Sequence, residues 1–163
     1  MKILKLSVLV ALLVLSPFLL PVSSAVASQP TVQASGNGVS FELFGGLRRT
    51  FSFSAVEMDG EVMGNALLSR ESPFEDDHHL DNVHVDINCI RVVDSHTLVI
   101  GGVLLKATEF LPEGTQEVFK VIDGGEGNEG DFVTGLFPGT CDSEPNFNLV
   151  PIEAGNINVR VHE

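Results

Sequence analysis

The stretch VHVDINC, residues 83–89, alternates apolar and polar side chains without a break. Successive side chains of an extended chain point to opposite faces, so this pattern describes a strand with one apolar and one polar face. The same alternation returns at 39–43, 51–55 and 157–161. Alternation with a period of two is typical of antiparallel sheets that bury one face. The sequence therefore predicts a β protein.

Less regular segments add further strands. We expect strands at 98–105, 118–122, 132–137 and 147–152, whereas residues 62–69 fit either a strand or a short helix. Clusters of Gly, Pro, Asp and Asn separate these segments and are typical of turns. Eight or nine short strands in a chain of this size predict an all-β fold, either a single antiparallel β-barrel or a β-sandwich.

The start of the chain has the pattern of an export signal. Two lysines, an apolar stretch, and the small residues Ala25 and Ala27 follow in the order of a secretory signal peptide. We expect residues 1–27 to be removed, 28–38 to form a flexible linker, and 39–163 to form one all-β domain. This organisation predicts a secreted protein, either extracellular or periplasmic.

The net charge of the chain indicates which classes of partner it does not bind. The chain has 163 residues with 22 acidic against 9 basic side chains, a formal charge of −13. Removal of residues 1–27 takes away Lys2 and Lys5 and no acid, which leaves −15. Nucleic acids and anionic membrane surfaces are bound by clustered Lys and Arg, so we expect no nucleic-acid partner. We also expect no membrane insertion after signal removal, and an extracellular ligand or surface partner of unknown identity.

The chain contains two cysteines, Cys89 and Cys141. In an oxidising compartment they are the only intramolecular pair available, so we expect a disulfide between them. The alternative is a buried free Cys89 packed as a small hydrophobe, with Cys141 exposed.

One candidate for catalysis is the polar side of the strand at 83–89. His84 and Asp86 are two residues apart and therefore project on the same side. If that side faced the lumen of a barrel, His84 would be an acid or base in a pocket. In a sandwich, or on the outside of a barrel, both residues would face water.

Two acidic segments are candidate metal sites. Asp77, His78 and His79 are residue types that bind transition metals, although adjacent residues of an extended loop point apart. The loop at 123–131 combines glycines with oxygen ligands suited to Ca²⁺, without the EF-hand spacing. Its candidate ligands are Asp123, Glu126, Asn128, Glu129 and Asp131. We expect no cofactor, with calcium as the open alternative to a flexible, charged hairpin.

Several turn and strand motifs resemble those of post-COAP-type domains, which are small all-β domains of secreted bacterial proteins. The motifs span most of the region from Val39 to His162, and they are FSFSA (51–55), HVDINCIRVV (84–93), LVIGGV (98–103), FKVIDGGEG (119–127), GDF (130–132) and GNINV (155–159). The chain departs from the family by carrying Gly124 where Asn is expected, and by an acidic loop that contains Cys141. The resemblance implies a bacterial extracellular β domain and carries over no catalytic residue.

Three hypotheses for function follow. The first is a secreted, non-catalytic β domain with a binding or structural role. The second is a small β-barrel enzyme, such as a cyclase, an isomerase or a metal-dependent lyase, with a site around His84 and Asp86. The third is a β module stabilised by calcium. Which face of the strand at 83–89 points inward discriminates the first two.

Overall fold

The computed structural model describes residues 30–41, 48–71, 81–106, 111–127, 129–143 and 148–162. The expected signal peptide, residues 1–27, lies outside these ranges. Regular structure in the described ranges is entirely β, and they contain no helix long and apolar enough to cross a membrane. The strands are β1 Val32–Phe41, β2 Arg48–Met58, β3 Glu61–Glu71, β4 Asp81–Asp94, β5 Thr97–Leu104, β6 Gln116–Ile122, β7 Phe132–Val133, β8 Phe137–Pro138 and β9 Val150–Val161.

Eight of these strands close into an antiparallel barrel. Neighbours follow the order β5-β4-β3-β2-β1-β9-β7-β6, and β6 pairs back onto β5. The ninth strand, β8, lies beside the start of β6. The predicted all-β fold is confirmed, and the structure selects the barrel over the sandwich. Residues 62–69, which fitted two kinds of element, lie within strand β3.

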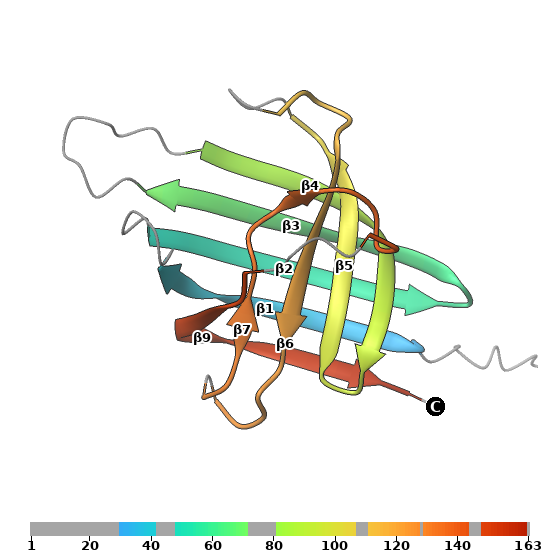
Figure 1. Cartoon of the computed structure of the whole chain (residues 1–163). Helices are drawn as coiled ribbons and strands as arrows, with labels where there is room; N and C mark the ends of the chain where they lie inside the picture. The colour runs from blue at the N-terminus through green and yellow to red at the C-terminus, as the bar shows by residue number, and fades with distance from the viewer. Residues whose placement is uncertain are drawn as a thin grey trace, which may run out of the picture.

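The barrel is flattened into two layers whose strands cross (Figure 1). The back layer contains β9, β1, β2, β3 and the first part of β4, and the front layer contains the second part of β4 with β5, β6 and β7. β4 passes from one layer to the other, and its register against β5 shifts between Ile87 and Cys89. A bulge of this kind bends a strand, which is how orthogonal sheets share a corner.

The interior of the barrel is apolar and aromatic. The rings of Phe53 and Phe119 meet edge to face with centroids 5.6 Å apart, and Phe51 lies beside Phe53 with centroids 6.4 Å apart. These rings join the two layers. The other buried core residues are Val32, Ala34, Ala55, Ala66, Val85, Ile87, Leu98, Ile100, Leu104, Val121, Val133, Ile152, Ile157 and Val159.

The prediction of a flexible linker at 28–38 is wrong from Val32 onward, because strand β1 begins there. The segment looked like a linker because its inward positions carry small residues instead of large apolar ones. A Cβ atom at Gly36 would lie 2.5 Å from the ring of Phe53. Glycine is therefore required at this position by the size of the ring that it faces.

The boundaries of the last strands also differ from the prediction. Residues 147–152 and 157–161 were expected as two strands, with a turn at 154–156, yet Val150–Val161 is the single strand β9. Gly155 adopts a φ of 117° within this strand, and the register of the strand against β1 shifts nearby. The glycine therefore allows an irregularity in the strand and does not form a turn. The expected strand at 132–137 is present as the two short strands β7 and β8.

Candidate functional site

The predicted disulfide is confirmed and fastens a covering segment to the outside of the barrel. Cys89 is bonded to Cys141, with Cα atoms 6.1 Å apart and a sequence separation of 52. A crosslink over this separation stabilises a fold by about 4 kcal/mol in the chain-entropy model. The Nε–H of Arg91 donates to the carbonyl of Cys141 at 2.7 Å. The covering segment, residues 137–143, is thus held at β4 by a covalent bond and by a hydrogen bond.

The sulfur atoms also occupy space that glycine leaves open. A Cβ at Gly101 would lie 2.8 Å from the Sγ of Cys89 and 3.1 Å from the Sγ of Cys141. Val99 and Val118 belong to the neighbouring strands β5 and β6 and are almost completely buried, although neither belongs to the core cluster of the barrel. The disulfide and these residues have a structural role.

His84 and Asp86 do not face the lumen. Val85 and Ile87 point inward and are buried, whereas His84 and Asp86 alternate with them and are exposed. A lumen site around His84 and Asp86 is therefore absent from the described barrel. This alternation is the arrangement expected for an antiparallel strand with one wet face.

The acidic loop of 123–131 uses its two terminal aspartates to close the barrel. The backbone N–H of Ile157 donates to Oδ2 of Asp131 at 2.7 Å, and the N–H of Val159 donates to Oδ2 of Asp123 at 2.8 Å. β7 pairs with β9 only at residues 150 and 151. Beyond that point, the carboxylates accept the two amide protons that a neighbouring strand would otherwise accept.

The remaining oxygens of the two aspartates hold the loop itself. Oδ1 of Asp131 accepts from the N–H of Gly124 at 2.7 Å, and Oδ1 of Asp123 accepts from the N–H of Gly125 at 2.8 Å. Asp131 is completely buried and Asp123 is nearly so. All four carboxylate oxygens of the pair therefore have backbone donors, and hydrogen bonds to a charged acceptor are among the strong ones.

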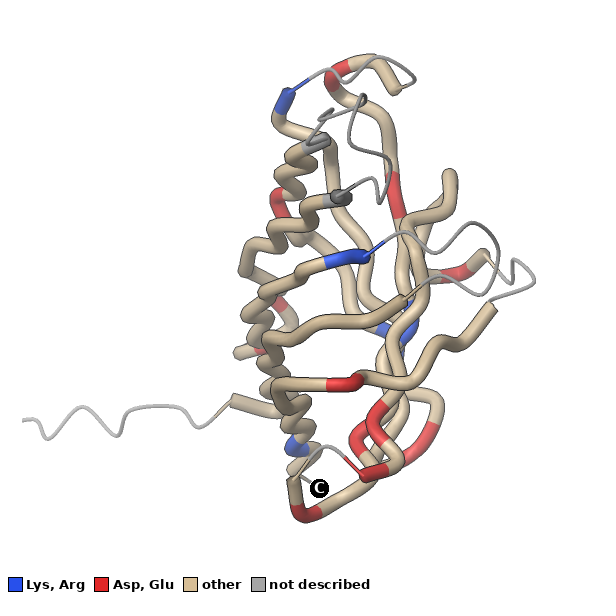
Figure 2. Tube along the Cα trace, turned by 90° about the vertical axis from the view of Figure 1, so that its left-hand side faces the viewer, with Lys and Arg blue, Asp and Glu red and all other residues tan. Residues whose placement is uncertain are grey.

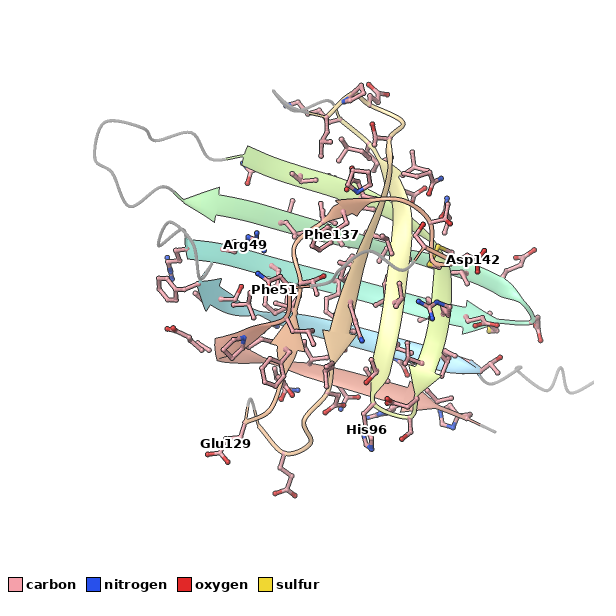
Figure 3. All side chains as sticks on the ribbon, in the orientation of Figure 1. Arg49, Phe51, His96, Glu129, Phe137 and Asp142 are labelled. Carbon is pink, nitrogen blue, oxygen red and sulfur yellow. A yellow bond between two sulfur atoms is a disulfide. The ribbon has the colours of Figure 1, made fainter. Side chains whose placement is uncertain are left out.

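The other predicted ligands do not complete a metal site in the described residues. Glu126 and Glu129 are exposed, and Figure 3 shows Glu129 pointing away from the barrel. Asn128, like Asp77, His78 and His79, lies outside the described residues. Within the described ranges no group of three or more His, Cys, Asp and Glu side chains is arranged to hold a metal ion.

One acidic residue inside the barrel was missed from the sequence. Glu117 of β6 pairs with Gly102 of β5 and points inward like Phe119. It is completely buried, and neither carboxylate oxygen has a hydrogen-bond partner among the described residues. Burial raises the pKa of the Glu117 carboxyl, because a charged carboxylate loses its hydration in an apolar interior. The sequence did contain a signal for this position, because Glu117 alternates in β6 with Phe119 and Val121, which both point into the core.

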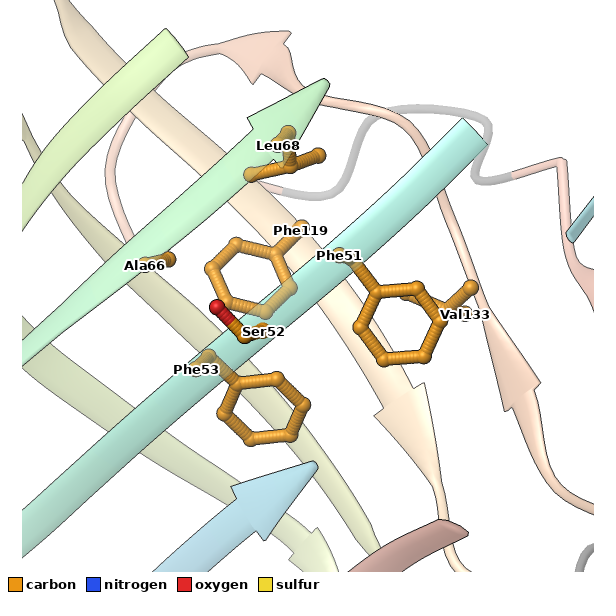
Figure 4. A pocket seen from close by; sticks show the side chains of 7 residues that line it. All are labelled: Phe51, Ser52, Phe53, Ala66, Leu68, Phe119 and Val133. Atoms are coloured by element: carbon orange, nitrogen blue, oxygen red, sulfur yellow. The ribbon is translucent and has the colours of Figure 1, made fainter. Parts of the chain in front are cut away.

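A small cavity lies between the rings of the core (Figure 4). Its volume is about 10 Å³, near the lower limit for one water molecule. The lining residues are Phe51, Ser52, Phe53, Ala66, Leu68, Phe119 and Val133. A cavity of this size and composition does not accommodate an organic substrate.

Comparisons with known proteins add no relative: no family model, no curated protein and no solved structure matches this chain.

Proposed function

We propose that this chain is an exported, non-catalytic β-barrel domain that acts through its outer surface. The observation that carries the proposal is which face of β4 points inward. Its apolar residues fill the barrel, and its ionisable residues His84 and Asp86 face outward. The cavity between the core rings is too small for a substrate. A binding or structural role on the outside needs neither a lumen nor a cofactor.

Two further features support export. The Cys89–Cys141 disulfide is typical of proteins that fold in an oxidising compartment. The resemblance to post-COAP-type domains also points to a secreted bacterial protein.

The test is whether a small apolar molecule enters the barrel. We expect no rise in the fluorescence of N-phenyl-1-naphthylamine, a neutral dye that becomes bright in apolar sites, when it is titrated with the protein. A filled core has no room for a naphthyl group. Fluorescence that saturates at one dye per chain, and that the cavity-filling variant Ala66→Val abolishes, would contradict the proposal. Dye bound outside the barrel would be unaffected by Ala66→Val, since this residue is buried.

A further inference from the structure

The outer face of the back layer carries a grid of uncharged polar side chains. Strand register places outward residues of β9, β1, β2 and β3 beside one another: Ser35 lies between Asn158 and Ser54, and Ser54 lies beside Asn65. In the next row Asn37 lies between Asn156 and Ser52, and Ser52 lies beside the exposed Leu67. We call the grid the Ser/Asn face, and it consists of Ser35, Asn37, Thr50, Ser52, Ser54, Asn65, Asn156 and Asn158, all of them exposed.

Most of these side chains keep their hydrogen-bonding groups available. Asn156 donates from its amide to the carbonyl of Ile157 at 3.1 Å. The other seven have no side-chain hydrogen bond to the part of the chain that the structure describes. Hydroxyl and amide groups both donate and accept, so the Ser/Asn face offers both kinds of group without a charge.

The face is uncharged in a chain that is otherwise strongly acidic. None of the 22 Asp and Glu residues and none of the 9 Lys and Arg residues belongs to it. Figure 2 shows several acidic residues at the lower end of the barrel, where the loop between β6 and β7 lies, and others at the upper end and along both layers. The acidic residue that pairs directly with a member of the Ser/Asn face is Asp86 of β4, which lies beside Asn65.

The dimensions of the face suit an extended ligand. Four neighbouring strands span about 14 Å across, and Thr50 to Ser54 spans about 14 Å along β2. A single sugar ring covers only part of this area, whereas a polymer with repeating hydroxyl groups meets several rows at once. Repeated weak contacts then add through multivalency.

We propose that the Ser/Asn face binds a neutral polysaccharide. An acidic partner is disfavoured by the charge of −13, and a cationic partner finds no acidic counter-charge among the residues of the Ser/Asn face. A second copy of the chain would need a more apolar patch, since the only large apolar side chain enclosed by the two rows is Leu67. The inference rests on the proposed function, because it assigns the outer surface as the working surface.

The experiment measures depletion of the protein from solution by insoluble neutral polymers: microcrystalline cellulose, chitin and an insoluble α-glucan. We expect binding to at least one of them that persists in 1 M NaCl, because contacts between uncharged groups are not screened by salt. Ser52→Glu places a charge at the centre of the face, and we expect it to lower the partition coefficient about tenfold.

The matched control is Ser95→Glu, the same substitution at an exposed residue of the turn between β4 and β5. It adds the same charge away from the face and should leave binding unchanged. Binding to none of the three polymers, or equal losses from both substitutions, would overturn the inference. Binding that disappears in 1 M NaCl would also overturn it and would point to a charged partner. None of these results with the polymers contradicts the proposed function. The proposed function fails only if the apolar dye enters the barrel.

Discussion

Asp131→Asn is expected to lower the free energy of unfolding by about 3 kcal/mol. The carboxylate of Asp131 accepts from two backbone donors, the N–H groups of Gly124 and Ile157. An asparagine keeps one acceptor oxygen and turns its NH2 group toward the other donor, so one buried N–H loses its partner. The size and shape of the side chain are preserved, which separates the hydrogen bond from packing. Urea unfolding at neutral pH measures the difference.

Glu129→Gln is the matched control for this prediction. It removes one negative charge from the same loop, but Glu129 is exposed. We expect a change within about 0.5 kcal/mol. If Asp131→Asn also stayed within that range, the carboxylates would not hold β9 in place, and the proposed closure of the barrel by its aspartates would be wrong.

Glu117→Gln is expected to stabilise the protein at neutral and alkaline pH and to have little effect near pH 4. The folded pKa of Glu117 is raised above the unfolded value of about 4.3. The folded state therefore holds this proton more tightly than the unfolded state does, and stability is lost as the pH rises from about 4 through the folded pKa. Glutamine has nearly the same shape and carries no charge, so the variant lacks this loss.

Urea unfolding of both proteins at pH 4, 6 and 8 tests the prediction. Other acids affect both proteins alike, so the informative quantity is the difference in the free energy of unfolding between them. We expect that difference to be near zero at pH 4 and to grow with pH in favour of Glu117→Gln. Parallel pH profiles, or a difference that grows toward low pH, would show that burial does not raise the pKa of this carboxyl.

The fold class followed from the sequence because the alternation in β4 is strict. The alternation separated Val85 and Ile87 from His84 and Asp86, but which side points into the barrel stayed open until the structure placed the apolar side inward. The first part of β1, which was assigned to the linker, was missed because the pattern depends on side-chain size. Gly36 is an inward residue whose space is filled by Phe53, a partner from another strand that a local pattern does not reveal.

The roles of the acidic residues were harder to predict for a chemical reason. A carboxylate in a glycine-rich loop accepts equally well from a cation and from backbone N–H groups, and only the position of β9 decides for Asp123 and Asp131. The pairing of Cys89 with Cys141 was predicted from the number of cysteines together with the expected oxidising compartment. Glu117 was overlooked because a single acid in an apolar run is far more common on a wet face than inside a core.

The central claim is that the barrel is filled by its apolar residues and presents His84 to the solvent. The most direct measurement is a proton nuclear Overhauser spectrum of the oxidised protein. We expect contacts between the ring protons of Phe53 and Phe119, and none between the imidazole of His84 and either ring. Contacts from the His84 imidazole to Phe119 would place the polar face of β4 inside the barrel and contradict the account.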